Sequence, residues 1–221
     1  MKVVYLSNSD IVDAVNFAVH TVSNHFHRMW SSEEEGIQKI VAGKLGEIAV
    51  LKYCDMTGRK VKRTNFKINT GVDTADMIIN KKNVAIKTKI FSRSVLPQLN
   101  EIFLHVPCDQ YPKMVENETK AIIAVCLRSN VPKDTNACAH VTGYKTNIVG
   151  GLPFDTFAQI KVLHKVGEEI SPGFLLPPPA SYGVRWSDLW EIEKLLIHLK
   201  EYKTRDTKQL YLCEEAATYS L

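Results

Sequence analysis

The sequence lacks any apolar run close to the roughly 18 residues that a membrane-spanning helix needs, which predicts no membrane partner. Its first eight residues are too short and turn polar too soon for a signal peptide, so the cytoplasm is the expected compartment. The five cysteines are scattered and odd in number. They do not suggest a disulfide framework, which agrees with a reducing compartment.

Internal repeats, low-complexity segments and obvious linkers are also missing, so the sequence predicts one domain over residues 1–221. What is present is a net charge of +4 that is unevenly distributed. Residues 59–93 hold ten basic residues against Asp73 and Asp76, so this segment carries +8 and the rest of the chain −4. Such a segment suits a polyanion, because each phosphate contact releases counterions. A basic face turned toward solvent explains the charge equally well.

Periodicity divides the chain into helices and strands. Apolar residues at helical spacing predict a helix over about 9–29. The run Ser31-Ser32-Glu33-Glu34-Glu35 is a capping-box pattern with acids in the first turn, and it opens a helix that should end near Cys54. Residues 108–115 are expected to form a loop or short helix, and 171–179 a proline-rich loop. Ser187 is expected to cap a last amphipathic helix that runs to about residue 202.

Strand patterns fill the middle of the chain. The strands that we expect lie at 60–66, 76–79, 84–90, 101–106, 121–127, 140–146 and 160–164. Residues 80–83 should form the turn between the second and third strands. The segment 121–127 is apolar throughout, as expected for a strand buried on both faces. This order predicts an α/β fold, with a mixed sheet and helices packed on its faces.

A carboxylate stands beside two glycines in the second helix, in the run Gly43-Lys44-Leu45-Gly46-Glu47. Glycine inside a helix costs roughly 1 kcal/mol relative to alanine, so close approach of another backbone is a sensible reason for both glycines. Glu47 lies next to the apolar stripe of the helix. Its carboxylate should therefore face the protein or a cleft, where it would need a cation.

A second acid and a lysine lie on neighbouring strands. Asp76 begins one strand and Lys87 lies on the next, so a tight hairpin can bring them side by side. Side-chain alternation places Ala85, Lys87 and Lys89 on one face. Lysines among apolar residues need a water-filled groove or an acidic partner. Glu47 and Asp76 could hold a hard divalent cation through oxygen ligands, and Lys87 beside them could orient a water or neutralise a phosphate.

These residues resemble the PD-(D/E)XK nuclease superfamily over roughly residues 31–127. Its members commonly show a helix reading G-x-x-G-E-x-A, an aspartate at the head of a strand, and acid-x-Lys on the partner strand. The matching residues are Gly43, Gly46, Glu47, Ala49, Asp76 and Lys87. The resemblance implies a restriction endonuclease-like fold, in which a mixed central β-sheet is flanked by helices. The strand at 121–127 would follow the catalytic hairpin after a crossing segment.

One position departs from the family pattern, because Ala85 stands where an acid normally precedes the lysine by two residues. That acid usually binds metal together with the aspartate. Some members use the helix glutamate instead, and Glu47 is available for this role. The alternative is a site that has lost its activity. Asp73 could also replace Asp76 if the hairpin register differs.

The resemblance implies Mg²⁺-dependent hydrolysis of DNA phosphodiester bonds, leaving a 5′-phosphate and a 3′-hydroxyl. Glu47, Asp76 and the main-chain carbonyl of Ile86 would hold Mg²⁺, which would polarise the phosphate and activate a water. Lys87 would position that water or stabilise negative charge in the transition state, so the catalytic set is Glu47, Asp76 and Lys87. The expected contacts with the DNA backbone are Lys44, Lys60, Lys62, Arg63, Lys89 and Arg93.

A single nuclease domain must carry its own specificity, which fits a type II restriction endonuclease cutting double-stranded DNA as a homodimer. Residues 128–221 match no motif and would supply recognition or dimer contacts. One alternative is a structure-directed or mobile-element nuclease of the same fold, resembling a junction resolvase. Another is a non-catalytic DNA-binding protein on a degenerate nuclease fold, which Ala85 would favour.

Soft metal ligands also occur, in His105-x-x-Cys108 and in Cys138-x-His140. A zinc site built from them would need paired ligands on turns at standard spacing. Neither pair has that arrangement, so the pattern disfavours zinc held by these four residues.

Overall fold

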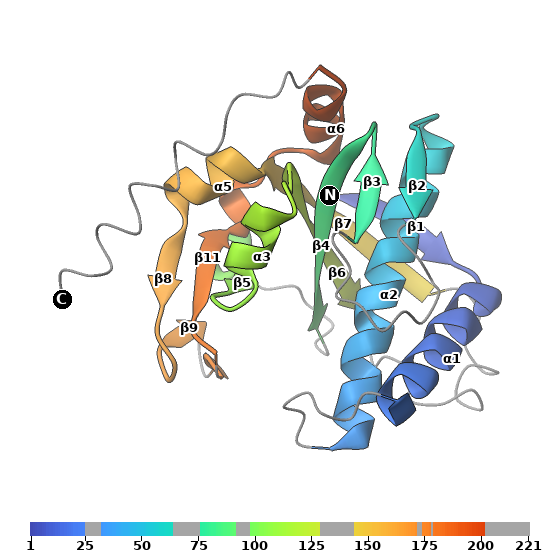
Figure 1. The fold of residues 1–221 in the computed structure, drawn as a ribbon, viewed down its shortest axis with the longest axis horizontal. Coiled ribbons are helices and arrows are strands. Elements are labelled where there is room, and N and C mark those ends of the chain that lie inside the picture. Colours follow the sequence, from blue (N-terminus) through green and yellow to red (C-terminus); the bar gives the residue numbers. More distant parts are fainter. Residues whose placement is uncertain are drawn as a thin grey trace.

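The computed structural model describes residues 1–24, 32–63, 76–91, 98–128, 144–171, 174–177 and 179–201. Figure 1 shows a central sheet with α1 and α2 on one side and a second group of strands and short helices on the other. The elements in chain order are β1 (Lys2–Leu6), α1 (Asn8–Asn24), α2 (Glu33–Met56), β2 (Val61–Arg63), β3 (Met77–Ile79), β4 (Lys82–Phe91), η1 (Leu99–Glu101), β5 (Phe103–Pro107), α3 (Tyr111–Glu116), β6 (Ala121–Arg128), β7 (Tyr144–Pro153), α5 (Phe154–Ile160), β8 (Val162–His164), β9 (Glu169–Ser171), β10 (Phe174–Leu175), β11 (Ser181–Arg185), η2 (Trp186–Asp188) and α6 (Ile192–Glu201).

The central sheet is mixed, as the sequence predicted. Within the described ranges its strand order is β1-β7-β6-β4-β3-β2. Strands β4 and β6 pair in parallel, and the other neighbours pair antiparallel. A parallel pair needs a crossover connection, and η1, β5 and α3 belong to the one between β4 and β6. The predicted α/β class with helices flanking a mixed sheet is therefore confirmed.

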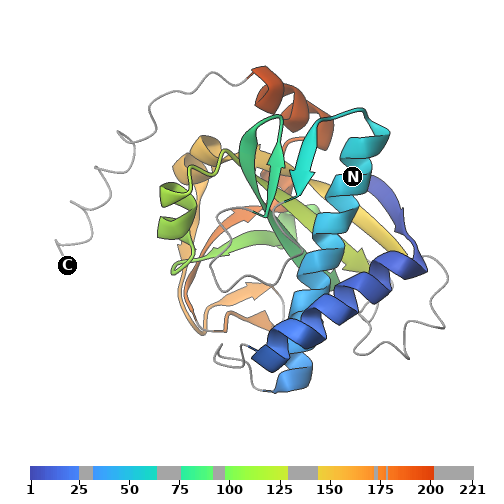
Figure 2. The same ribbon diagram turned by 45° about the vertical axis from the view of Figure 1, so that its right-hand side comes forward.

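Strand β6 separates two hydrophobic cores. Its odd-numbered residues 121–127 face the core formed with α1, α2 and α6, and Ile122, Ala124 and Cys126 face the second core. The second core includes residues of β5, β11, α3 and α5. The expectation of a strand buried on both faces is confirmed. Figure 2 shows α2 crossing one face of the sheet with α1 packed beside it.

Local signals explain the bounds of α2. The hydroxyl of Ser32 accepts the N–H of Glu35 at 3.1 Å, and acids fill the first turn. The helix ends at Met56, two residues beyond the predicted end. Gly58 follows with a φ of +66°, the left-handed conformation that commonly terminates helices. Helix α1 covers the predicted helix through residue 24, and 25–29 lie outside the described residues.

The predicted cap of the last helix is wrong. Ser187 lies in η2, and α6 begins only at Ile192. The intervening Trp190 is held in an extended bridge, because its N–H and its carbonyl both bond to Gly151 at 2.9 and 3.1 Å. This long-range pairing prevents residue 190 from joining the helix.

Several strands were not foreseen. Strand β1 pairs with β7, and β11 joins β5 and β8 in a three-stranded sheet. A proline-rich loop was expected over 171–179, but β10 lies within this segment and pairs with β9, which ends at Ser171. Strand β7 extends to Pro153, well beyond the predicted segment 140–146, whose first four residues lie outside the described ranges. None of the helices in the described ranges combines the length and apolar character needed to cross a membrane.

A polar cluster joins three elements at the edge of the first core. Glu193 on α6 accepts a hydrogen bond from the hydroxyl of Tyr53 on α2 at 2.8 Å and pairs with Lys2 on β1 at 2.5 Å. The bond from Lys2 is the main cause that lowers the pKa of Glu193 to about 2. The carboxylate therefore favours the folded state only while it is ionised.

We expect Glu193→Gln to lower the free energy of unfolding at pH 7 by about 1 kcal/mol or less, because the pair is partly exposed. The folded pKa lies below the ordinary value of 4.5, so the contribution is present above pH 4.5 and is lost as the pH falls toward 2. Urea unfolding at pH 7 and pH 3.5 should show the difference from wild type shrinking. Glu201→Gln, at the exposed end of α6, is the control. An equal difference at both pH values would contradict this account.

Candidate functional site

A tight turn fixes the hairpin that carries the candidate site. Ile79 pairs with Lys82, so only Asn80 and Lys81 form the turn, shorter than the predicted 80–83. Both have positive φ values, of 50° and 65°, as in the turn type that matches the twist of antiparallel strands. The register that follows pairs Met77 with Val84. Asp76, the residue directly before β3, therefore lies beside the middle of β4.

Asp76 is bonded directly to β4. Its Oδ2 accepts the N–H of Ile86 at 2.6 Å. Ile86 lies past the last β3–β4 pair, so the carboxylate satisfies an N–H that the ladder leaves open. In an extended strand the N–H and carbonyl of one residue point to the same edge. The carbonyl of Ile86 therefore leaves β4 on the edge where Asp76 lies.

Lys87 follows on β4 and points toward the second core. Its Nζ donates a hydrogen bond to Oε1 of Gln110, just before α3, at 2.8 Å. Burial lowers the pKa of Lys87, and the charges of Asp76 and Asp109 act in the opposite direction. Lys87 thus lies among Asp76, Asp109 and Gln110. The sequence did not reveal the last two as site residues, because more than twenty residues separate them from Lys87 and no local pattern links them.

Helix α2 touches β4 at Gly46. A Cβ added there would lie 2.0 Å from Oγ1 of Thr88, so the helix leaves no room for a side chain. A close approach does occur at Gly46, but the neighbour is the side chain of Thr88 and not the backbone that was expected. The expectation is wrong for Gly43, where an added Cβ would meet nothing within 4 Å. Thr88 and Lys87 alternate along β4, so Lys87 leaves the strand on the face away from α2.

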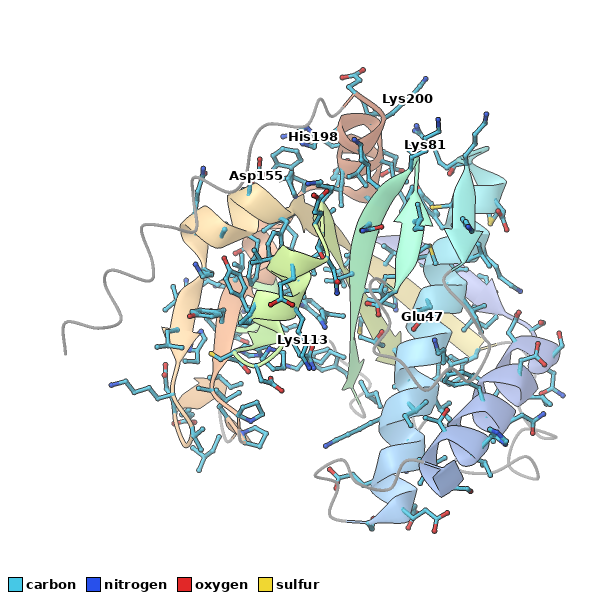
Figure 3. The ribbon with its side chains drawn as sticks, in the orientation of Figure 1. Glu47, Lys81, Lys113, Asp155, His198 and Lys200 are labelled. Atoms are coloured by element: carbon cyan, nitrogen blue, oxygen red, sulfur yellow. The ribbon has the colours of Figure 1, made fainter. Side chains whose placement is uncertain are left out.

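Glu47 follows Gly46 and comes from the stretch of α2 that lies alongside β3 and β4 (Figure 3). Its oxygens accept hydrogen bonds from Nζ of Lys44 at 2.8 and 3.0 Å. The two side chains are only 15% and 9% exposed, and the same Nζ lies 4.6 Å from the centroid of the Phe17 ring. The cation expected beside Glu47 is thus supplied by Lys44. Asp76 accepts a hydrogen bond from Ile86, and Lys87 donates one to Gln110. Glu47 instead accepts hydrogen bonds from Lys44.

The residues present fit a Mg²⁺ ion in part. Mg²⁺ is commonly bound by one or two carboxylates together with waters and substrate phosphates. Asp76 and the carbonyl of Ile86 offer two oxygen donors on one strand edge. Ala85 is buried in the second core and adds no ligand. Among the described residues, no group of three or more His, Cys, Asp and Glu is arranged to hold a metal ion, and Asp73 lies outside them.

The residues that were predicted to contact DNA differ in their exposure to solvent. Lys60 and Lys62 are exposed near β2. Lys89 is partly buried, and that burial lowers its pKa. The side chain of Arg63 and all of Arg93 lie outside the described residues, so their roles stay predictions.

Comparison with protein-family models gave no match for this chain. Searches against curated proteins and against solved structures likewise found nothing similar.

We expect Gly46→Ala to destabilise the fold by about 1 to 3 kcal/mol, because its methyl group overlaps Thr88 in a packed interface. Gly43→Ala is the matched control, and it should stabilise by up to about 1 kcal/mol through helix propensity alone. Denaturant unfolding measures both changes. Adding Thr88→Ala should recover part of the loss in Gly46→Ala. Equal stabilisation by both alanines would contradict the described contact.

Proposed function

We propose that this chain is a Mg²⁺-dependent DNA endonuclease whose centre is formed by Asp76, the carbonyl of Ile86 and Lys87. The observation that carries the proposal is the hydrogen bond from the N–H of Ile86 to Asp76, which joins the acid to the strand that bears Lys87. The order of elements supports it. A helix with Glu47 precedes an antiparallel hairpin, and a crossing segment leads to a strand parallel to β4. This order agrees with the restriction endonuclease-like arrangement that the sequence resemblance implies.

Each residue has a role that follows from its surroundings. When bound, Mg²⁺ would supply Lewis-acid activation of the scissile phosphate. Asp76 and the carbonyl of Ile86 would hold it on one edge of β4. Gln110 orients the amine of Lys87, which can donate a hydrogen bond to a phosphate oxygen or to the attacking water. Burial lowers the pKa of Lys87, and the charges of Asp76 and Asp109 oppose that shift.

Glu47 is proposed as the second carboxylate, in place of the acid that Ala85 lacks. It follows the point where α2 touches β4, and its pairing with Lys44 indicates surroundings that favour a positive charge. Lys44 then acts as the resident counter-charge of Glu47. A buried carboxylate that loses its cation is costly, so a metal ion could replace the ammonium group in the same role.

The proposed substrate is double-stranded DNA cut at a short specific site by a homodimer, as in type II restriction. Residues 128–221 were expected to supply recognition. Part of this segment, β7, belongs to the central sheet, whereas β8 and β11 form the three-stranded sheet with β5. Within the described part of this segment, the three-stranded sheet is proposed to supply recognition or dimer contacts. The second candidate, DNA binding without cleavage, is favoured by the apolar surroundings of Ala85.

Asp76→Asn and Lys87→Gln should each lower the rate of DNA cleavage in Mg²⁺ by about 100-fold or more, because each removes a group that acts on the reacting phosphate. The measurement is the initial rate on long double-stranded DNA, with EDTA abolishing it in the wild type. Asp13→Asn, on the exposed side of α1, and Lys81→Gln, at the hairpin tip in Figure 3, make the same chemical changes elsewhere.

Variants at Asp76 and Lys87 that cut as fast as these controls would contradict the proposal. Discrete fragments would indicate restriction at a specific site. Cleavage confined to branched substrates would indicate a structure-directed nuclease instead.

The pairing of Glu47 with Lys44 gives a separate test. Glu47→Gln should raise the Mg²⁺ concentration needed for half-maximal cleavage, because a ligand is lost. Lys44→Met should lower it, because the competing cation is removed while the carboxylate stays. A Mg²⁺ titration of the cleavage rate measures both. Shifts in the same direction would show that the pair serves the fold alone.

A further inference from the structure

Two histidines converge on the face of the three-stranded sheet that is turned away from the second core. In this sheet, β11 lies between β5 and β8. Gly183 on β11 pairs with His105 on β5. Ser181, two residues before Gly183 on the same strand, pairs with His164 on β8. A Cβ added to Gly183 would lie 2.7 Å from Nε2 of His164 and 3.1 Å from Cδ2 of His105. The missing side chain of Gly183 thus leaves the space into which both rings project.

The two rings are close but are not bonded to each other. Their centroids lie 5.4 Å apart, and the planes are nearly perpendicular at 88°. Nε2 of each ring is buried and has no hydrogen-bond partner among the described residues. His164 is only 6% exposed. A buried polar atom without a partner destabilises the fold, so two of them on adjacent rings point to a ligand that would pair with both.

A carboxylate fixes which nitrogen of His164 is available. Nδ1 of His164 lies 2.9 Å from Oε1 of Glu168. An ionised carboxylate only accepts hydrogen bonds, so Nδ1 of His164 donates to Glu168, and Nε2 is the nitrogen left for a ligand. A carboxylate that orients a histidine in this way is a common outer partner of metal-bound imidazole.

Burial and neighbouring charges both act on the ring of His105. Burial, together with the charge of Lys89 and the neighbouring His164, lowers the pKa of His105 to about 4. Glu168 provides the negative charge that faces the pair, and Lys89 provides a positive one.

We propose that Nε2 of His105 and Nε2 of His164 bind a divalent transition metal of the Zn²⁺ class, with water in the remaining coordination positions. Two imidazole ligands suit Zn²⁺, Cu²⁺ or Ni²⁺ and do not suit Mg²⁺, which takes oxygen ligands. Glu168 is a positioning residue that acts through His164. The site is separate from the one formed by Asp76 and Lys87, and it does not depend on the proposed nuclease activity.

The proposed ligands differ from the four histidines and cysteines that were considered for zinc from the sequence. His105 is retained, and its partner is His164 on β8, a residue 59 positions away in the chain. Cys108 follows the end of β5, and burial raises the pKa of its thiol, which disfavours the thiolate that a metal requires. Cys138 and His140 lie outside the described residues. A metal here would tie β5 to β8 across β11 and so stabilise the sheet.

The test is a Zn²⁺ titration of the full chain, freed of metal and followed by calorimetry, with the shift in melting temperature as a second readout. Wild type should bind one Zn²⁺ at this site and melt at a higher temperature with it. His105→Gln and His164→Gln should each weaken binding at least tenfold and lose the shift. Glu168→Ala should weaken binding about 10- to 100-fold. His20→Gln, an exposed histidine on α1, is the control and should bind as the wild type does.

Gly183→Ala keeps both histidines and fills the space between them, so it should also lose binding. If His164→Gln fails to fold, Gly183→Ala and His105→Gln still test whether Zn²⁺ binds between the two histidines. Absence of Zn²⁺ binding by the wild type would overturn the proposal. So would unchanged affinity and stoichiometry in His105→Gln and Gly183→Ala.

Discussion

The parallel pairing of β4 with β6 is the constraint on which the rest of the structure depends. Both strands run the same way, so the chain must cross between them, and the crossing segment brings β5 and α3 to one face of β4. That face carries Lys87, whose amine meets Gln110 there. The opposite face carries Thr88, against which Gly46 lets α2 pack closely. The hairpin, meanwhile, delivers Asp76 to the edge of the same strand. Strand β4 therefore brings Asp76 and Lys87 together, whereas Glu47 comes from the helix on the opposite face.

Local patterns predicted the parts of this arrangement that local physics determines. The capping box set the start of α2, and the hairpin brought Asp76 to β4, because both depend on residues close in sequence. The apolar run 121–127 identified a strand buried on both faces. The partners Gln110 and Lys44 were not predicted in their roles. Gln110 reaches Lys87 only through the crossover, and the sequence does not show that Lys44 is buried in an ion pair with Glu47.

Long-range pairing explains where the sequence failed. Ser187 was expected to start a helix, but Trp190 is held extended by Gly151, which lies on β7. Strand β11 was not predicted because Gly183 weakens strand propensity, and the same glycine leaves space for His105 and His164. The two proposed sites would also use different chemistry. One edge offers oxygen donors to a hard cation, and one sheet face offers imidazole nitrogen to a softer one.

The central claim is that the edge of β4 supports hydrolysis of DNA. The most direct measurement is digestion of long double-stranded DNA by the wild-type chain in Mg²⁺, followed by sequencing and chemical analysis of the new ends. For a Mg²⁺-dependent nuclease, we expect internal breaks that carry 5′-phosphates and 3′-hydroxyls and that do not form in EDTA. DNA that stays intact at every Mg²⁺ concentration, on linear and branched substrates alike, would contradict it.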